Sequence, residues 1–357
     1  MHPNLKNAVV EAAAEKVMED AAQASHAREE SAVIRRLVQE LADVRKHLGI
    51  YDGGMSAPIA PPTWRAKPTR EAKHAGIVVA CLSDTHWDEV IVPEQVHFLN
   101  AYNRVIAERR LKVWAEKVVD LPRSYTRGIA IEGLVVPALG DFFSGEIHDE
   151  LRRSNEASIL PTILYWIERV ISVAELFDRE YKGAVEFDVV VGNHGRIPDK
   201  PVYKNRPQNN FEWFAWSIIR DRLLERGSRV TVNVSPAMAM TIPIYGRNHR
   251  LEHGDEFKGG SGISAALAPL MLGQHRTSVQ QIAIGEPLYT MVIGHWHQVL
   301  DLPGLICAGA MKGTDEYAFG KKYRPEEAQQ ALWITTPERG KTVTMPVVVQ
   351  DREAEGW

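Results

Sequence analysis

Residues 289–297 read Tyr-Thr-Met-Val-Ile-Gly-His-Trp-His, an apolar run that ends abruptly in two histidines. Four other short runs end in the same way, in side chains that can bind a metal. Their endings are Asp84-Thr-His86, Gly140-Asp141, Gly192-Asn193-His194 and His253-Gly-Asp255. The segments before them, 77–83, 134–139, 187–191 and 250–252, are expected to be strands. Ligands gather beyond the carboxyl ends of strands in layered α/β folds, so we expect all five endings to converge.

The chemistry of these endings favours a metal centre. Asp-x-His and His-x-His place both ligands on one side of an extended segment, because strand side chains alternate. Glycine before Asp141, Asn193 and His295 permits a sharp turn or a close backbone approach. Imidazole, carboxylate and amide donors without thiolate suit divalent Mn, Fe, Zn, Ni or Co. Seven ligands are too many for one ion with open positions and suit two ions roughly 3.5–4 Å apart.

Helical patterns separate the expected strands. We expect helices at residues 96–118, 159–181, 211–226 and 263–272. Asn209 or Asn210 can cap the third of these. Strands dominate after residue 229, with further runs at 289–293, 305–308, 331–336 and 343–349. The alternation of strands and helices in the first half indicates an α/β fold.

The N-terminal part differs from the rest of the chain in its sequence pattern and composition. Residues 1–50 are expected to form a helical arm, with an apolar stripe at Ile34, Leu37, Leu41, Val44 and Leu48. This stripe either docks on the chain's own core or makes a homo-oligomer. Residues 51–75 read as a Pro/Gly-rich linker with basic side chains from Arg65 to Lys73 that could touch nucleic acid. The main domain is expected at 76–350.

Composition excludes several classes of protein. The chain has 357 residues, 45% of them apolar and 25% charged, with a net charge of −4. No global basic field is therefore present to hold nucleic acid by charge alone. Two cysteines, Cys81 and Cys307, rule out a disulfide framework. No apolar run reaches the roughly 20 residues needed to span a bilayer. We expect a soluble protein of the cytosol, in a bacterium or a phage-infected host.

The five endings, in this order, resemble the calcineurin-like metallophosphoesterase superfamily. The family pattern is Asp-x-His, Gly-Asp, Gly-Asn-His, a single His and Gly-His-x-His, and it covers about residues 76–336 here. The resemblance implies a four-layer α/β/β/α sandwich of two mixed sheets. It also implies two divalent ions, with manganese the expected metal. The sequence around Gly140 and Asn193 resembles that of a branch often carried by phages and prophages.

The resemblance assigns a role to each residue. It implies that the first metal is held by Asp84, His86, Asp141 and His297. It implies that the second is held by Asp141, Asn193, His253 and His295, with Asp141 bridging. His194 would contact the phosphate and assist the leaving group. Two departures put the support of His194 in question: Ser144 and Gly195 stand where many members have acids, and Glu146 or Asp255 would have to substitute.

We expect a phosphodiesterase acting on nucleic acid or nucleotides, in which a metal-bridging hydroxide attacks in line. Possible substrates are DNA, RNA or a cyclic nucleotide. A phosphomonoesterase and a non-catalytic binding protein on the same fold are the alternatives. Candidate substrate contacts are Arg196, His148 and Trp296. The charges at Arg196, Lys200, Lys204 and Arg206 form either a solvated loop or a basic lip for phosphates. Trp87 either stacks on a base or packs beside the site, and Lys312 and Asp315 could line the cleft.

Overall fold

The computed structural model describes residues 63–66, 74–258 and 267–357. The chain divides into two compact units, residues 1–60 and 61–357, and all described residues belong to the second. The expected N-terminal arm and its role in oligomerisation lie outside the described residues and stay predictions. Within the described part, no helix combines the length and the apolar character needed to cross a membrane.

The first sheet has six strands in the order β11-β10-β1-β2-β3-β4. Their bounds are β1 Ala75–Ala80, β2 Ala130–Ala138, β3 Val185–Val189, β4 Thr231–Val234, β10 Gln329–Thr336 and β11 Gly340–Val348. Strands β1 to β4 are parallel, whereas β10 pairs antiparallel with both β1 and β11. The sheet is therefore mixed, and the carboxyl ends of β1, β2 and β3 meet at one edge.

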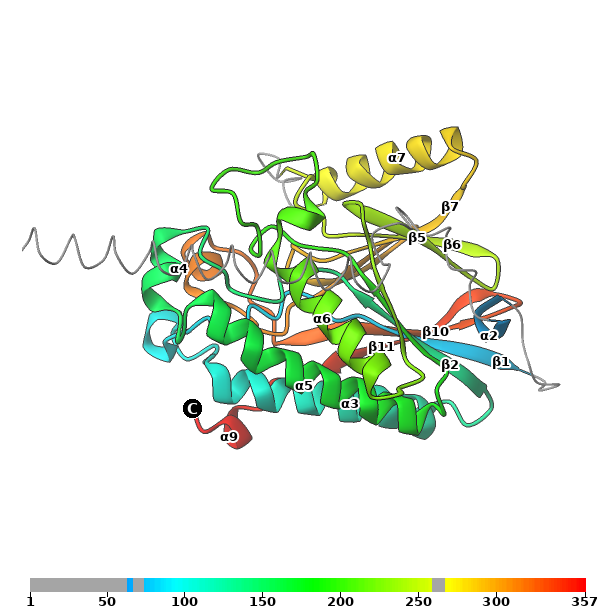
Figure 1. Cartoon of the computed structure of the whole chain (residues 1–357), viewed down its shortest axis with the longest axis horizontal. Helices are drawn as coiled ribbons and strands as arrows, with labels where there is room; N and C mark the ends of the chain where they lie inside the picture. Colours follow the sequence, from blue (N-terminus) through cyan, green and yellow to red (C-terminus); the bar gives the residue numbers. More distant parts are fainter. Residues whose placement is uncertain (1–62, 67–73, 259–266) are drawn as a thin grey trace, which may run out of the picture. The chain divides into compact units, whose positions relative to one another are not determined.

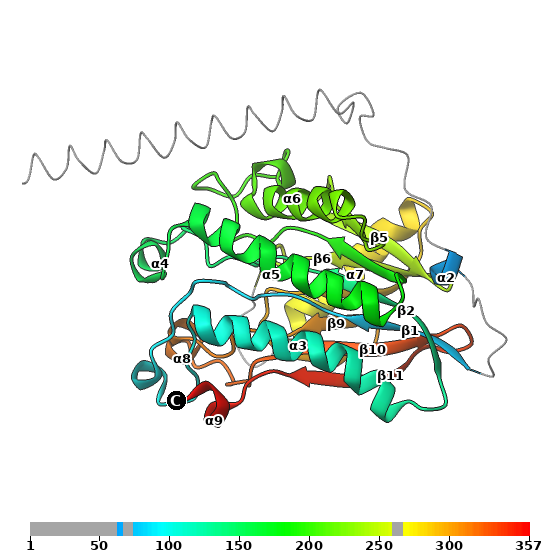
Figure 2. The ribbon, with the colours of Figure 1, turned by 60° about the horizontal axis from the view of Figure 1, so that its bottom comes forward.

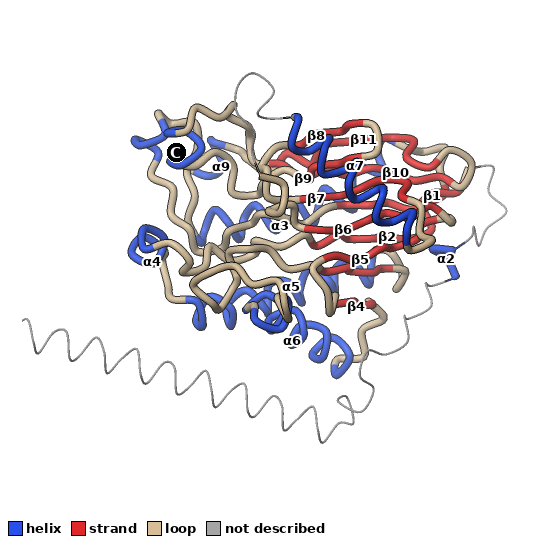
Figure 3. The backbone as a smooth tube through the Cα atoms, turned by 90° about the horizontal axis from the view of Figure 1, so that it is seen from above, coloured by secondary structure: helices blue, strands red, loops and turns tan. Residues whose placement is uncertain are grey.

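The second sheet has five strands in the order β5-β6-β7-β9-β8. Their bounds are β5 Ala239–Ile244, β6 Arg247–Glu252, β7 Leu288–Ile293, β8 Val299–Leu302 and β9 Leu305–Ala308. Strands β6, β7 and β9 are parallel, and the two edge strands are antiparallel to their neighbours. Figure 3 shows loops gathered at one end of the strands of both sheets.

Three buried clusters separate four layers. The largest lies between the first sheet and the helices α3 (Arg104–Tyr125), α5 (Ile159–Glu180) and α6 (Phe211–Glu225). A second lies between the sheets and includes Val79, Val190 and Val292. A third packs Leu270 of α7 (Ala268–Ala283) against β7 and β9. Figure 1 shows α7 on one outer face and the other three helices on the opposite face, and in Figure 2 these three helices lie in front of the strands. The α/β/β/α sandwich of two mixed sheets is confirmed.

The remaining short elements connect these layers. They are α2 Thr63–Ala66, η1 Pro93–Val96, α4 Asp149–Ser154, η2 Pro207–Asn209, α8 Glu316–Gly320 and α9 Arg352–Glu355. The carboxylate of Glu355 in α9 is paired with Arg110 of α3, and both side chains are fully buried.

Two expected helices and one strand differ from the expectation. The helix expected from residue 96 begins at Arg104, because His97 and Phe98 have φ of 51° and 56°, which no right-handed helix accepts. Strand β8 was not expected. Helix α7 runs on to Ala283, since its inner positions beyond Leu270 are small or polar and give no apolar period. The helix expected at 211–226 is confirmed, and the Asn210 side chain caps it by accepting from Glu212 N.

One residue expected in the linker is an anchor of the domain. Arg65 in α2 is only 4% exposed and its guanidinium lies 2.6 Å from Glu186 and 3.3 Å from Asp188 of β3. A buried cation with two carboxylate partners is not free for phosphate groups. Arg65 itself is therefore not available to nucleic acid, whereas Lys67, Arg70 and Lys73 of the same basic segment lie outside the described residues, and their role stays a prediction.

Candidate metal centre

The loops that follow β1 and β2 run side by side. Asp84 N donates to Gly140 O at 3.0 Å, and His86 N donates to Asp141 O at 3.0 Å. The side-chain amide of Gln330 on β10 holds the start of the first loop, because it bonds both the N–H and the carbonyl of Ser83. This pairing brings Asp84 and His86 beside Asp141.

The second sheet is joined to these loops through its own strand ends. His253, after β6, directs Nδ1 to the carbonyl of Leu139 at 2.7 Å. Gly294 N donates to His253 O at 3.0 Å, and His295 N donates to the Asp84 carboxylate at 3.0 Å. The ends of β6 and β7 are thus fixed against the ends of β1 and β2.

Three groups of side chains could each hold a cation among the described residues. They are Asp84 with His86 and His297, His86 with Asp141 and His194, and Asp141 with His253 and His295. Within each group the potential ligand atoms lie within 4.8 Å of one another. Asp141 and His86 each belong to two of the groups, and of the two only the carboxylate of Asp141 has a pair of oxygens with which to bridge two ions. The amide oxygen of Asn193 lies 3.2 Å from Nε2 of His253 and so adjoins the third group.

The directions of the imidazoles test whether this donor set fits metal ions. Nδ1 of His253 lies on a carbonyl oxygen, so its Nε2 is turned toward Asp141 Oδ2 at 3.0 Å and Asn193 Oδ1 at 3.2 Å. Nε2 of His86 and Nε2 of His297 face each other at 3.2 Å. Ring nitrogens and carboxylate or amide oxygens therefore meet at one place, where either protons or a shared cation satisfy them. The donor set therefore fits divalent metal ions.

The charged groups of the centre shift one another's pKa values. Burial alone would raise the pKa of Asp141, but the nearby histidines His253, His194 and His86 lower this pKa well below its usual value. Burial opposes protonation of His253, yet Asp141 raises its pKa well above the ordinary value. Burial and the charge of His253 lower the pKa of His295 to about 4. The Asp141 carboxylate therefore stays ionised and can bind a cation.

The expectation that the Asp-x-His and His-x-His segments are extended was wrong. Asp84 and His86 have φ of 49° and 44°, and His295 and His297 have φ of 64° and 52°. All four residues lie in the left-handed region, where few non-glycine residues occur. Their side chains converge because the backbone coils beyond each strand, and strand alternation plays no part.

Glycines allow two of these loops to touch. Gly140 has φ of 89°, and a Cβ there would lie 2.2 Å from Gly192 N. A Cβ on Gly192 would lie 2.1 Å from Oδ1 of Asp141. The expected close approach of the Gly-Asp and Gly-Asn-His segments is confirmed.

The support of His194 comes from the main chain. Its Nδ1 lies 2.7 Å from the carbonyl oxygen of Ser144, and its Nε2 lies 4.0 Å from Asp141. The two acids expected as substitutes are engaged elsewhere. Glu146 accepts from Ile159 N at the start of α5, and Asp255 pairs with Arg206 at 2.6 Å. The residue at 144 therefore orients His194 through its backbone, which no side-chain pattern could indicate.

The three candidate substrate contacts lie in different settings. His148 is exposed, with its ring centroid 6.0 Å from that of His194. The Arg196 guanidinium is partly buried and donates to the carbonyls of Asn193 and Asp199. Trp296 is half-buried and packs on the cluster between α7 and the second sheet.

Two other candidate substrate contacts, Trp87 and Arg206, are already paired with other residues of the protein. Trp87 is 2% exposed and stacks on Trp166 at 4.5 Å, so it packs beside the site. Arg206 is paired with Asp255 and Glu256, which leaves Lys200 and Lys204 as the exposed charges of the expected lip.

Several supporting residues escaped the sequence reasoning. Lys312, considered as a cleft residue, is buried and paired with Glu89 and Asp315. Glu89 Oε2 in turn lies 3.2 Å from Nδ1 of His86. Glu212 at the start of α6 accepts two backbone N–H bonds beside the centre. An acid in the first turn of a helix usually serves only the helix dipole, so its position gave no signal.

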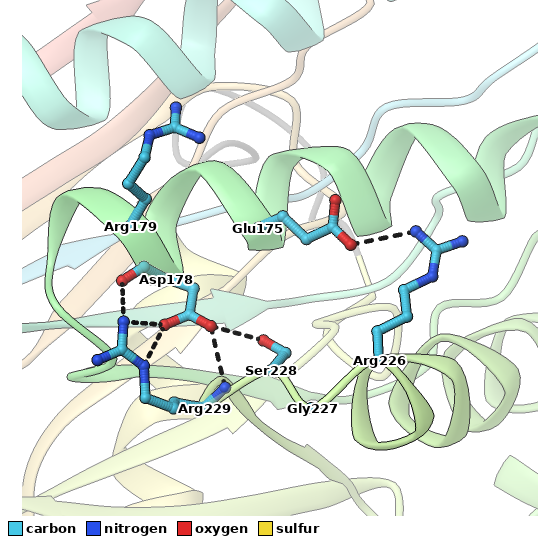
Figure 4. A pocket seen from close by; sticks show the side chains of 7 residues that line it. All are labelled: Glu175, Asp178, Arg179, Arg226, Gly227, Ser228 and Arg229. Atoms are coloured by element: carbon cyan, nitrogen blue, oxygen red, sulfur yellow. Dashed lines mark hydrogen bonds and ion pairs between the residues drawn. The ribbon is translucent and has the colours of Figure 1, made fainter.

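A surface pocket lies away from this centre (Figure 4). It is lined by Glu175, Asp178, Arg179, Arg226, Gly227, Ser228 and Arg229. Arg226 pairs with Glu175 at 3.1 Å and Arg229 with Asp178 at 2.8 Å. The pocket adjoins the C-terminal ends of α5 and α6, whereas the candidate ligands follow the carboxyl ends of strands. Most of the charged residues that line this pocket are therefore paired with one another.

Comparisons with known proteins add the following. Neither a family model nor a curated protein matches the sequence. A dimetal phosphatase from Danio rerio is similar, with 10% identity, a TM-score of 0.36, and coverage of 77% of this chain and 99% of that chain. Vps29 complexed with zinc from Entamoeba histolytica has 11% identity, a TM-score of 0.28, and coverage of 76% and 99%. A predicted phosphoesterase from Streptococcus pneumoniae has 10% identity, a TM-score of 0.26, and coverage of 75% and 95%.

Proposed function

We propose that this chain is a metal-dependent phosphoric ester hydrolase of the calcineurin-like metallophosphoesterase type. The observation that carries the proposal is the convergence of imidazole Nε2 atoms on two buried carboxylates. His297 Nε2 lies 3.2 Å from Asp84, and His253 Nε2 lies 3.0 Å from Asp141. The proposed ligands are Asp84, His86, Asp141, Asn193, His253, His295 and His297. Two divalent ions held there would lower the pKa of water and neutralise phosphoryl oxygens.

The chain's own residues supply the other parts of the reaction. Burial lowers the pKa of His194, although Asp141 and the Ser144 carbonyl raise it in part. A bound phosphate anion would raise this pKa further and so favour a proton on Nε2. His194 would then donate that proton to the leaving oxygen as a general acid. Arg196, which already bonds the Asn193 carbonyl, would bind a phosphate oxygen.

We propose further that phosphodiesters, of nucleic acid or nucleotides, are the substrates. The exposed Lys200 and Lys204 follow Arg196 in one loop and would extend the anionic contact beyond a single phosphate. Trp296 and His148 would border the bound substrate. Manganese is the proposed metal, and Fe, Zn, Ni and Co are the alternatives that suit the same nitrogen and oxygen donors.

A substrate panel tests the proposal. The metal-free protein is loaded with Mn²⁺, Ni²⁺, Zn²⁺ or Mg²⁺ and assayed on bis-p-nitrophenyl phosphate, the monoester, 2′,3′-cyclic nucleotides, and single- and double-stranded DNA and RNA. We expect metal-dependent hydrolysis with the diester faster than the monoester. Faster monoester hydrolysis would make the chain a phosphatase. A protein that binds no transition metal and hydrolyses nothing would be a binding protein on this fold.

A further inference from the structure

The start of α6 lies between two of the loops that carry candidate ligands. The carboxylate of Glu212, which is fully buried, accepts from Phe142 N through Oε1 at 2.7 Å. Its other oxygen, Oε2, accepts from Gly192 N at 2.7 Å. Phe142 directly follows Asp141, and Gly192 directly precedes Asn193. One rigid carboxylate therefore ties together the backbones of two candidate ligands.

The cap residue of the same helix completes this tie. Asn210 Nδ2 donates to Gly192 O at 2.9 Å, and Asn210 Oδ1 accepts from Glu212 N at 2.8 Å. Both polar backbone groups of Gly192 are thus bonded to the first turn of α6. A main-chain bond from Phe211 N to Gly195 O, at 2.8 Å, holds the far side of the same loop.

Gly195 makes room for this arrangement. A Cβ at position 195 would lie 2.4 Å from Oδ1 of Asn210 and 2.6 Å from Cγ of Glu212. Any larger residue would therefore push these two side chains away from the loop. The glycine and the two α6 side chains form one fitted unit.

We propose that Glu212 is a positioning residue, which sets the separation of Asp141 and Asn193 and so builds the second metal site. This inference rests on the proposed dinuclear centre. The carboxyl oxygens of Glu212 bond backbone N–H groups, so it acts through the backbone of Phe142 and Gly192. A carboxyl group suits this role, because its two oxygens accept two N–H bonds at once. Burial and the charge of Asp141 raise the pKa of Glu212 to about 8, and the two N–H bonds oppose this rise. Residues that orient ligands in this way typically change metal affinity 10–100-fold when replaced.

Glu212→Gln is the first test, because the amide keeps the shape but turns an NH₂ group toward one backbone N–H. Mn²⁺ binding to the metal-free protein is followed by electron paramagnetic resonance, which separates free, isolated and spin-coupled ions. We expect the second Mn²⁺ to bind about 10–100-fold more weakly and the spin-coupled signal to fall. The first ion, near Asp84 and His297, should keep its affinity. Glu225→Gln, on an exposed residue of the same helix, is the matched control.

Gly195→Ala gives an independent test that leaves the carboxylate in place. The added methyl group should displace Glu212 and produce the same selective loss, and it decides the question if Glu212→Gln does not fold. Unchanged binding of both ions in the folded variants, or a lower melting temperature alone, would reduce Glu212 to a helix cap and overturn the inference. A wild-type protein that binds no Mn²⁺ would instead overturn the proposed function.

Discussion

Five of the seven candidate ligands have left-handed backbone angles. Asp84, His86, Asp141, His295 and His297 all have φ between 44° and 64°. Each such residue costs ~1–3 kcal/mol, and such conformations persist only where the surrounding structure imposes them. Here hydrogen bonds between the loops impose them, as in the pairing of His86 N with Asp141 O. Strain concentrated on metal-ligating side chains is typical of a functional site.

The bridging position of Asp141 gives the first prediction. Asp141→Asn keeps the shape of the side chain but removes the charge that both proposed ions share. We expect both metal affinities to fall at least 100-fold and turnover to be lost, with the larger loss at the ion near His253 and His295. Metal content after dialysis, measured by mass spectrometry, checks this. Asp120→Asn, on the exposed face of α3, should keep its metals; retention of two ions by Asp141→Asn would rule out a bridging role.

The proposed acid gives the second prediction. His194→Ala should keep its metals, since His194 is not among the proposed ligands, but should lose about 10²–10⁴ in rate on a nucleotide diester. The loss should be smaller with p-nitrophenolate as leaving group, because this anion needs little help from a proton. Steady-state kinetics on the two substrates measure the difference.

The control for this variant is His275→Ala, an exposed histidine on α7. An equal loss on both substrates would show that His194 binds the phosphate and donates no proton. Wild-type rates in His194→Ala on both substrates would remove it from the reaction.

At the scale of elements, the sequence predicted what local patterns encode and missed what depends on contacts across the fold. The five strand ends and the capped start of α6 follow from apolar runs and an Asn cap. The start of α3 depends on left-handed angles at His97 and Phe98, which the residue types do not demand. Glu212 and Lys312 are charged residues that only tertiary pairing can bury. A sequence pattern places such charged residues on the surface, so the sequence could not predict that Glu212 and Lys312 are buried beside the centre.

The loop between β9 and α8 gives the third prediction. Lys312 is 3% exposed and lies 3.0 Å from Glu89 and 2.5 Å from Asp315. Burial opposes its charge, but Asp315 and Glu89 raise the pKa of Lys312 overall. Lys312→Met leaves two buried carboxylates without a cation, so we expect a loss of about 3–5 kcal/mol in unfolding free energy. Urea denaturation measures this loss.

The control for this variant is a lysine in an exposed ion pair. Lys112→Met, at an exposed pair with Glu116, should change stability by less than about 1 kcal/mol. A loss of similar size in both lysine variants would mean that the buried pairs contribute nothing beyond a surface ion pair.

At the scale of the whole domain, a buried polar cluster joins the chain before β1 to the last two strands of the first sheet, β3 and β4. Arg65 reaches Glu186 and Asp188 of β3, and Asn233 of β4 donates to both acids. Trp64 beside it packs on the cluster between the sheets. The segment around α2 is thus part of the folded domain, and the domain's stability depends on the protonation of two neighbouring acids.

This cluster predicts a pH dependence of folding stability. Burial and the neighbouring Asp188 raise the pKa of Glu186 to about 8, against an ordinary value of 4.5. Between these two values the unfolded chain has lost the proton that the folded protein retains, so the Glu186 contribution to stability falls as pH rises from about 4.5 to about 8. Glu186→Gln does not titrate and still offers an oxygen to Arg65. Relative to wild type, its unfolding free energy should therefore rise across this window by up to a few kcal/mol. Urea denaturation at pH 5, 6, 7 and 8 measures the difference, with Glu225→Gln as the exposed control. A difference that is flat or falls with pH would show that Glu186 is already ionised in the folded protein and neutralised by Arg65.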